Sequence, residues 1–154
     1  HDWPAPLHEL GASFLYALRD GNMSLMTTWQ ALDGFPPTEH GLMSEKGPTK
    51  KTYAAMQFWR FIRPGMVRID AVVDGKLDAV AFEDPASKET VLILLNRNKT
   101  AVPVSLGRAD KHAHAIKSAF VTDVSRDFVQ VSDWTNAGNI SMPPEALATL
   151  LLTA

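Results

Sequence analysis

The sequence of 154 residues contains no cysteine. This absence excludes disulfide bonds, thiolate zinc sites and a cysteine nucleophile. The sequence also lacks any apolar run close to the ~20 residues that span a bilayer, so we expect no transmembrane helix and no membrane partner. Its first residues, His1 to Pro4, have neither a basic segment nor an apolar run, which predicts no signal peptide there.

An excess of positive charge is absent too. The chain has 15 Lys and Arg against 17 Asp and Glu, which gives a formal net charge of -2. Nucleic-acid binding requires a cationic face, so we expect no nucleic-acid partner. Hydrophobic residues make up 45% of the chain and charged residues 21%, a composition typical of chains that bury a core. The length suits one ordinary domain, or one small domain with part of another.

The first 62 residues have a pattern of helix, strand, loop and helix. Apolar residues at helical spacing predict a helix over 6–19. The uncharged run 23–32, rich in Met, Leu, Thr and Trp, predicts a strand that is covered on both faces, as in a parallel sheet. Three prolines and three glycines predict a long irregular loop over 34–50. The aromatic-rich segment 50–62 predicts a second helix, which ends before Pro64.

From Gly65 onward, the apolar pattern changes to a period of two residues. Short apolar segments are separated by turn residues at intervals of roughly ten residues, a spacing typical of an antiparallel β-sandwich. The predicted strands are 67–73, 79–83, 90–95, 102–106, 116–122, 128–131, 139–142 and 148–152.

The first half of the chain cannot form a complete sheet alone. A single parallel-type strand between two helices has no neighbours for its edges. We therefore interpret the first half as the last part of a larger α/β architecture whose other strands lie outside this chain.

Several motifs resemble glycoside hydrolase family 30. The most distinctive is RFIRPGMVRI at 60–69, preceded by KKTY at 50–53; TVLILLN at 90–96 and ISMPPE at 140–145 are also similar to the family's sandwich strands. Trp59 departs from the family pattern, which has a small residue there. The resemblance implies that 1–64 hold helix 7, strand 8 and helix 8 of a (β/α)8 TIM barrel, and that 65–154 form a side β-sandwich.

The resemblance also implies an activity. The whole enzyme would be a retaining glycoside hydrolase that acts on β-linked polysaccharide, of xylan or β-glucan type, and secretion is implied by resemblance alone. Such enzymes use two carboxylates at the ends of barrel strands, and in this family these come from the fourth and seventh strands. Neither strand is present, so we predict no catalytic residue here and no activity for the chain alone. Its expected partners are a polysaccharide or oligosaccharide substrate and the N-terminal barrel portion, with no cofactor. The sequence leaves open whether the chain is a truncation, a proteolytic product or half of a split enzyme.

Trp29 and His40 are the candidate substrate-binding residues. Trp29 lies near the C-terminal end of the predicted strand, where an aromatic ring can stack on the apolar face of a sugar. The alternative for Trp29 is a place in the core. His40 lies in the loop that would border the cleft, and its alternative is an exposed loop histidine. That loop has Lys46 and Lys50 but no arginine, which argues against bidentate recognition of a uronate.

Other chemically capable residues receive structural interpretations. His112 and His114 could begin a metal site, but further ligands are not evident, so we predict no metal. The carboxylates of Asp33, Glu39 and Glu45 are interpreted as solvated loop groups. The arginines at the junction between the halves are interpreted as clamps between packed segments; they are Arg60, Arg63 and Arg68.

Two other functions remain open. One is a noncatalytic carbohydrate-binding sandwich, which would need a row of exposed aromatic residues on one face. The other is an interaction or stability module without glycan contact. After Gly65 the aromatic residues are few, and alternation predicts that the three phenylalanines lie in the core, with Trp134 in core or turn packing; the phenylalanines are Phe82, Phe120 and Phe128.

Overall fold

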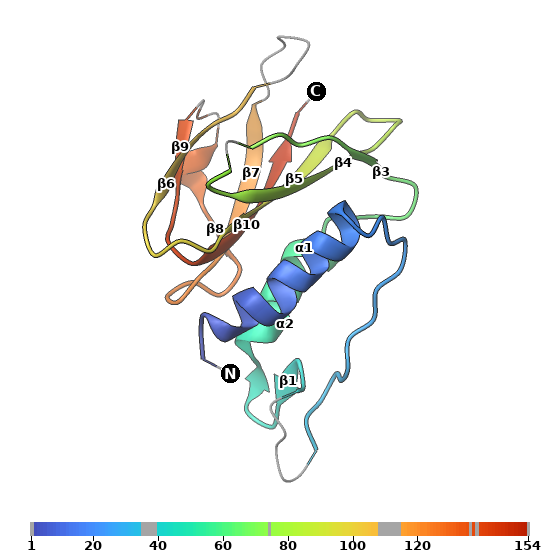
Figure 1. Cartoon of the computed structure of the whole chain (residues 1–154), viewed down its shortest axis with the longest axis vertical. Helices are drawn as coiled ribbons and strands as arrows, with labels where there is room; N and C mark the ends of the chain where they lie inside the picture. The colour runs from blue at the N-terminus through green and yellow to red at the C-terminus, as the bar shows by residue number, and fades with distance from the viewer. Residues whose placement is uncertain are drawn as a thin grey trace.

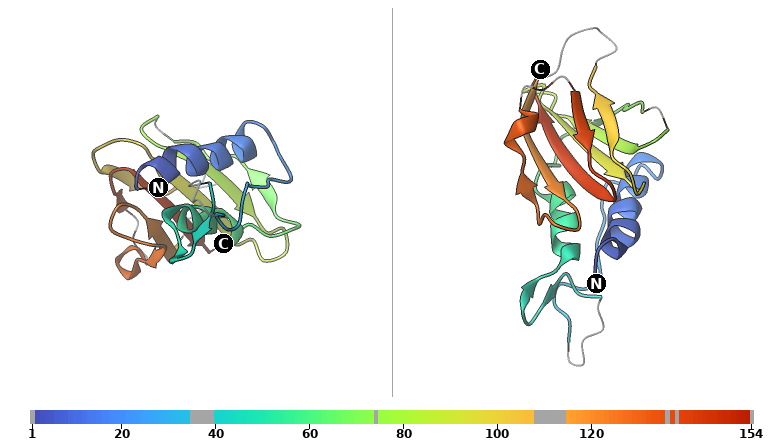
Figure 2. Two further views of the ribbon diagram at one scale, coloured as in Figure 1. Left: turned by 90° about the horizontal axis from the view of Figure 1, so that it is seen from below. Right: turned by 90° about the vertical axis from the view of Figure 1, so that its left-hand side faces the viewer.

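The computed structural model of the chain contains a six-stranded antiparallel sheet with two helical segments on one face (Figure 1). The structure describes residues 2–34, 40–73, 75–107, 115–135, 137 and 139–153. The sheet has the order β3-β4-β5-β10-β7-β8, and a separate pair, β6-β9, lies over its other face (Figure 2). The chain thus has three layers: helices, the large sheet and the small sheet.

Both predicted helices are present. The first consists of a π-helical turn, η1 (Leu7–Gly11), that continues into α1 (Ala12–Arg19). Beyond it Asn22 adopts a φ of 47°, the left-handed conformation typical of a helix end. The second helix, α2 (Lys50–Trp59), begins where the side chain of Thr49 accepts a hydrogen bond from the Lys51 backbone N–H at 3.2 Å.

The eight predicted sandwich strands are also present. The main difference is β3, which ends four residues earlier than predicted because residues 70–73 pair with no strand among the described residues. Their bounds are β3 (Val67–Ile69), β4 (Asp78–Glu83), β5 (Thr90–Asn96), β6 (Val102–Ser105), β7 (Ile116–Thr122), β8 (Val129–Gln130), β9 (Asn139–Met142) and β10 (Ala146–Leu152).

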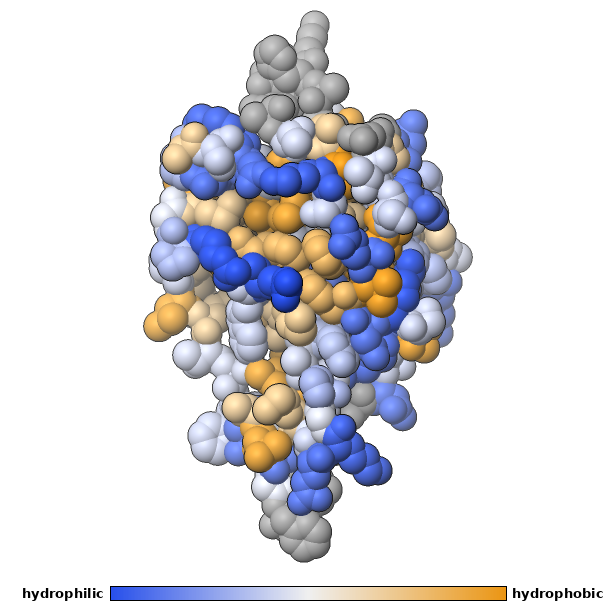
Figure 3. Space-filling view, turned by 180° about the vertical axis from the view of Figure 1, so that it is seen from behind, coloured by the Kyte–Doolittle hydropathy of each residue, from blue (hydrophilic) through white to orange (hydrophobic). Residues whose placement is uncertain are grey.

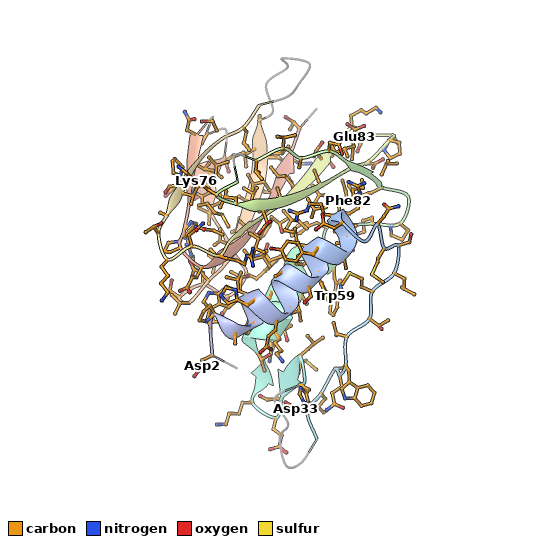
Figure 4. All side chains as sticks on the ribbon, viewed as in Figure 1. Asp2, Asp33, Trp59, Lys76, Phe82 and Glu83 are labelled. Atoms are coloured by element: carbon orange, nitrogen blue, oxygen red, sulfur yellow. The ribbon has the colours of Figure 1, made fainter. Side chains whose placement is uncertain are left out.

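Two hydrophobic cores lie on opposite faces of the large sheet. Alternation along the strands divides the side chains between them: Ile93 of β5 packs with the helices, whereas Leu94 packs with β6 and β9. On the helix side, Phe82 of β4 points toward α1 (Figure 4), and Phe14 and Phe58 meet edge to face at 5.4 Å. The helices of the first half therefore share one core with the sheet of the second half.

Hydrogen bonds between buried polar groups also hold α2 against the sheet. Gln57 of α2 is fully buried and donates from its side-chain amide to Thr122 Oγ1 of β7 at 2.9 Å. The Thr149 hydroxyl of β10 lies 2.7 Å from the Gln57 backbone oxygen, to which it donates. A buried polar group without a partner is costly, so these bonds fix the position of α2 on the sheet.

One prediction for the first half is wrong. Residues 23–32 do not form a strand; this segment runs as an extended trace beside the helices (Figure 1), and its single bridge joins Leu32 to Met43. The segment exposes large apolar side chains, including Met23 and Leu25. A strand exists only where its backbone groups meet a neighbouring strand, and beyond this one bridge none of the described residues supplies such a neighbour.

A turn after β7 joins the sheet to the start of α2. Asp123 is 4% exposed, and its carboxylate accepts hydrogen bonds from the Ser125 and Arg126 backbone N–H groups at 2.9 and 2.8 Å. The Arg126 guanidinium also pairs with it, and Lys50 Nζ donates to the Asp123 carbonyl at 2.6 Å. Burial alone would raise the pKa of Asp123, but the hydrogen bonds from Arg126 and Ser125 outweigh it, so this pKa lies below its usual value.

We expect this carboxylate to stabilise the chain above the pKa it has when unfolded, about 3.9. The stability is lost as the pH falls through the lower pKa of the folded state. The variant Asp123→Asn should therefore show a flatter decline of unfolding free energy between about pH 5 and 2, measured by urea titration. Asp133→Asn removes an exposed carboxylate and should keep the wild-type slope; equal slopes for wild type and Asp123→Asn would contradict the assignment.

Candidate functional site

The candidate site lies at the end of the molecule opposite the sandwich. It is built from residues 29–33, from 40–42 and from a small hairpin of β1 (Met43–Ser44) and β2 (Gly47–Pro48), with Asp33 beside this hairpin in Figure 4. The loop predicted over 34–50 therefore contains a hairpin that the sequence analysis missed. Its only local signal is Gly47, whose φ of 110° suits the tight turn after Lys46.

Backbone hydrogen bonds hold the segment after Trp29. The N–H groups of Leu42 and Met43 donate to the carbonyls of Gln30 and Ala31, each at 2.9 Å. In return, the Asp33 N–H donates to the Met43 carbonyl at 3.1 Å. These bonds form a short parallel ladder that fixes the direction in which the chain leaves Trp29.

The ladder is attached to α2 through one carbonyl group. The Leu42 oxygen accepts from the Thr49 N–H at 3.0 Å and from the Thr49 hydroxyl at 2.7 Å, and the Thr52 hydroxyl also donates to it. Thr49 is at the same time the residue that caps α2. The first turn of α2 thus positions the loop that follows Trp29, a role that the sequence analysis did not assign to Thr49 or Thr52.

Gly41 closes the neck of the loop. Its N–H donates to Asp33 Oδ1 at 3.0 Å, so this carboxylate has a structural bond rather than a purely solvated position. A Cβ atom on Gly41 would lie 2.5 Å from the Asp33 backbone nitrogen, closer than real contacts allow. No other residue type fits this neck without a shift of the backbone.

The candidate residues are both at the surface. The side chain of Trp29 is 80% exposed, so its alternative placement in the core of this chain is wrong. His40 is exposed next to the ladder, and Lys46 and Glu45 are exposed at the turn of the hairpin. Figure 3 shows apolar surface at this end of the molecule, where Leu32 and Met43 are exposed. The arrangement combines an aromatic face with apolar and polar groups, which is suited to contact with a sugar ring.

The remaining candidate residues from the sequence lie either outside the described residues or at the junction between the two halves. Glu39, His112 and His114 lie outside the described residues. Of the junction arginines, Arg63 donates to the Trp59 carbonyl at 2.7 Å, and Arg60 lies over the Phe128 ring at 5.7 Å. The Arg60 contact joins the two halves of the chain, as predicted for a clamp, whereas the Arg63 contact stays within the end of the α2 segment.

The aromatic residues of the sandwich leave no open platform among the described residues. Phe82 and Trp134 are buried, as predicted. Phe120 and Phe128 are only half-buried, which differs from the prediction because they lie at the β8 edge of the sheet. Their rings stack on each other at 5.0 Å, and Phe61 stacks on Phe128 at 5.8 Å, so these faces are occupied by one another.

Comparison with known proteins identifies a family for the sandwich part of the chain. Residues 65–150 match the family described as "Glycosyl hydrolase family 30 beta sandwich domain". Glucuronoxylanase XynC of Bacillus subtilis (strain 168) is 23% identical over 154 residues, which cover 97% of this chain and 35% of the xylanase.

Solved structures show the same fold. The family 30 subfamily 8 xylanase Xyn30A from Clostridium acetobutylicum superposes with a TM-score of 0.85 and 22% identity, over 99% of this chain and 40% of that protein. A GH30 endoxylanase from Clostridium papyrosolvens C71 superposes with a TM-score of 0.73 and 20% identity, over 96% of this chain and 38% of that protein.

The fold and the matched region define the C-terminal β-sandwich part of a glycoside hydrolase. The chain belongs to glycoside hydrolase family 30. It spans 35% of the length of the Bacillus relative and 40% of the length of the Clostridium acetobutylicum relative. Within the described residues, no helix has the length and apolar character that crossing a membrane requires.

Proposed function

We propose that this chain is the C-terminal portion of a retaining glycoside hydrolase that acts on β-linked polysaccharide of xylan or β-glucan type. Residues 1–64 supply the last elements of a (β/α)8 barrel, and 65–154 form the side sandwich. The chain completes the barrel and one wall of the cleft, whereas the catalytic carboxylate pair comes from the N-terminal barrel portion. The assembled enzyme acts outside the cell, where its polysaccharide is found.

The observation that carries this proposal is the state of residues 23–32. They lie between two helices that are packed on the sheet, yet apart from the bridge from Leu32 to Met43 they have no strand partner among the described residues, and they expose Met23, Leu25 and Trp29. An apolar segment left in water costs free energy that neighbouring barrel strands would recover. The superposition on 99% of this chain but 40% of a xylanase supports an origin of those strands outside this chain.

A small pocket supports the same view. It measures about 150 Å³ and lies between the helices and residues 24–26, with Phe14, Trp59 and Leu25 among its lining residues. Trp59 packs against Phe14 at 5.7 Å but remains 43% exposed. In the proposed barrel, residues 23–32 become the eighth strand, and the helices cover its outer side.

Trp29 takes the role of a sugar platform in this arrangement. Its exposed ring stands at the end of the segment that becomes the strand, and active sites of such barrels lie at the C-terminal ends of strands. His40 borders the same end of the molecule and contacts the substrate from the loop. A noncatalytic carbohydrate-binding module is less well supported, because the half-buried sandwich phenylalanines cover one another.

Reconstitution tests the proposal. We expect the chain alone to release no reducing ends from xylan or β-glucan. Mixed with the part of the Clostridium acetobutylicum xylanase that lies outside the superposed region, it should yield hydrolysis that neither piece shows alone. The xylanase's own C-terminal piece serves as the positive control. Activity of the chain alone would contradict the proposal, as would a failure to assemble under conditions in which the positive control is active.

A further inference from the structure

The first turn of α2 lies between the sandwich and the candidate site. Figure 1 shows that the helix begins next to the hairpin of β1 and β2, at the end of the molecule that carries the candidate site. The turn that follows β7 reaches the same end of the helix. The first turn of α2 is therefore in contact with a sandwich turn and with the loop after Trp29 at once.

Lys50, the first residue of α2, makes the contact with the sandwich. Its Nζ atom donates to the Asp123 carbonyl at 2.6 Å and to the Arg126 carbonyl at 3.3 Å. The same atom pairs with the Asp127 carboxylate at 2.5 Å, and the Lys50 side chain is only 20% exposed. Because these hydrogen bonds are charge-assisted and partly shielded from water, they hold the helix end more firmly than an exposed ion pair would.

A second turn of the sandwich reaches the same corner of the molecule. The ring of Trp3 lies 5.8 Å from Lys50 Nζ, within the range of a cation–π contact. Trp3 Nε1 donates to the Glu145 carbonyl at 2.5 Å, in the turn between β9 and β10. The ammonium group of Lys50 is therefore surrounded by groups that the sandwich holds in place.

The residues next to Lys50 make the contact with the candidate site. The hydroxyl groups of Thr49 and Thr52 both donate to the Leu42 carbonyl. The Leu42 N–H in turn donates at 2.9 Å to the carbonyl of Gln30, the residue that follows Trp29. A displacement of the first turn of α2 would therefore move the ladder behind Trp29 with it.

The core contacts of α2 lie too far along the helix to replace Lys50. Gln57, which is fully buried against the sheet, follows Lys50 by about 10 Å of helix. Nearer the start, the Thr122 hydroxyl donates to the Tyr53 carbonyl at 3.3 Å, a longer bond than the one from Lys50 to Asp123. Helix ends have backbone groups without intrahelical partners, so the position of this end depends on its side-chain contacts.

We propose that Lys50 is a positioning residue for substrate binding, which fixes the ladder behind Trp29 to the sandwich through the first turn of α2. The inference rests on the proposed function, because the substrate is the same β-linked polysaccharide. A loop that adopts its binding position only part of the time binds its ligand more weakly by that fraction. Loss of the Lys50 contacts should therefore weaken substrate binding and leave the chemical step, which uses carboxylates outside this chain, little changed.

Hydrogen exchange of the chain alone tests the attachment. Lys50→Met keeps the apolar stem but removes the ammonium group, so the Leu42 amide should exchange about fivefold faster or more. The amide of Ile93, in the centre of the large sheet, reports global opening and should change less. Lys117→Met is the matched control, because it removes an exposed ion pair with Glu89, and it should leave Leu42 unchanged. Equal exchange of Leu42 in wild type and Lys50→Met would overturn the inference.

Kinetics of the reconstituted enzyme separate positioning from stability. With the chain at saturating concentration, Lys50→Met should raise KM for xylan about three- to tenfold and change kcat by less than about twofold. Loss of stability alone would instead lower kcat, because fewer molecules are folded, and would leave KM as it is. Thr52→Val removes the hydroxyl that is bonded to Leu42 and should raise KM in the same way, whereas Thr52→Ser keeps the hydroxyl and should behave like wild type.

The outcomes distinguish this inference from the proposed function. An active Lys50→Met complex with unchanged KM, or with a fall in kcat alone, would overturn the inference and leave the proposed function intact. Faster exchange of Leu42 with unchanged KM would overturn it as well, because the attachment would then have no effect on substrate binding. Absence of an active complex with the wild-type chain, under conditions in which the positive control is active, would overturn both.

Discussion

The variant Trp29→Ala should lower kcat/KM of the reconstituted enzyme by roughly 10- to 150-fold. Loss of the aromatic face removes about 1.5–3 kcal/mol of apolar contact with the sugar, and each 1.4 kcal/mol corresponds to a factor of ten. Because the side chain is 80% exposed in this chain, its removal should leave the folding of the chain unchanged. The measurement is reducing-end release at several xylan concentrations, together with thermal melting of the chain alone.

Gln30→Ala is the matched control for this effect. Gln30 is the next residue and would project to the opposite side of a strand, and its contribution to the ladder is through its backbone carbonyl. It should change activity less than about threefold, and Trp29→Phe should retain part of the wild-type activity because an aromatic face remains. Equal losses for Trp29→Ala and Gln30→Ala would show that the segment, rather than the ring, matters.

The variant Phe58→Ala should destabilise the chain by about 3–5 kcal/mol, the usual cost of truncating a buried phenylalanine. Phe58 is 1% exposed and packs in the core that the helices share with β4, β5 and β10. Small domains have only about 5–15 kcal/mol of total stability, so a large unfolded fraction is expected at physiological temperature. Urea titration followed by far-UV circular dichroism gives the change.

Trp59→Ala is the comparison for Phe58→Ala. Trp59 is the neighbouring residue on α2 but is 43% exposed, so its loss should cost clearly less than that of Phe58. If the two halves share one core, Phe58→Ala should lower the melting of helices and sheet in a single transition. Two separate transitions, with the sheet unaffected, would show that the halves fold independently.

The helices and sandwich strands could be predicted from local pattern because their apolar residues match a core that this chain contains. The alternation in TVLILLN at 90–96 corresponds to the two faces of β5, one toward the helices and one toward β9. The same reasoning failed for 23–32. Its composition suits a strand, but strand formation depends on neighbours that the described residues do not supply.

The candidate site, too, could be predicted only in part from the sequence. Trp29 could be selected from its residue type and position, whereas the ladder from Gln30 to Met43 and its attachment to Thr49 and Thr52 could not. These bonds join residues whose pairing depends on how the loop folds back, and backbone carbonyls carry no sequence signal. The glycine at position 41 is informative only after the fold places it against Asp33.

By itself, the sequence determined the helices, the sandwich strands and the family, because periodicity and the motif around Pro64 are local properties of the chain. Only the tertiary structure decided that the helices share a core with the sheet, and that 23–32 pair with no described strand beyond the bridge from Leu32 to Met43. The physical reason is that burial and strand pairing are relations between distant segments. The residue pattern of a segment indicates whether it is suited to be a strand. Whether a neighbouring strand is present to pair with it depends on the folded structure.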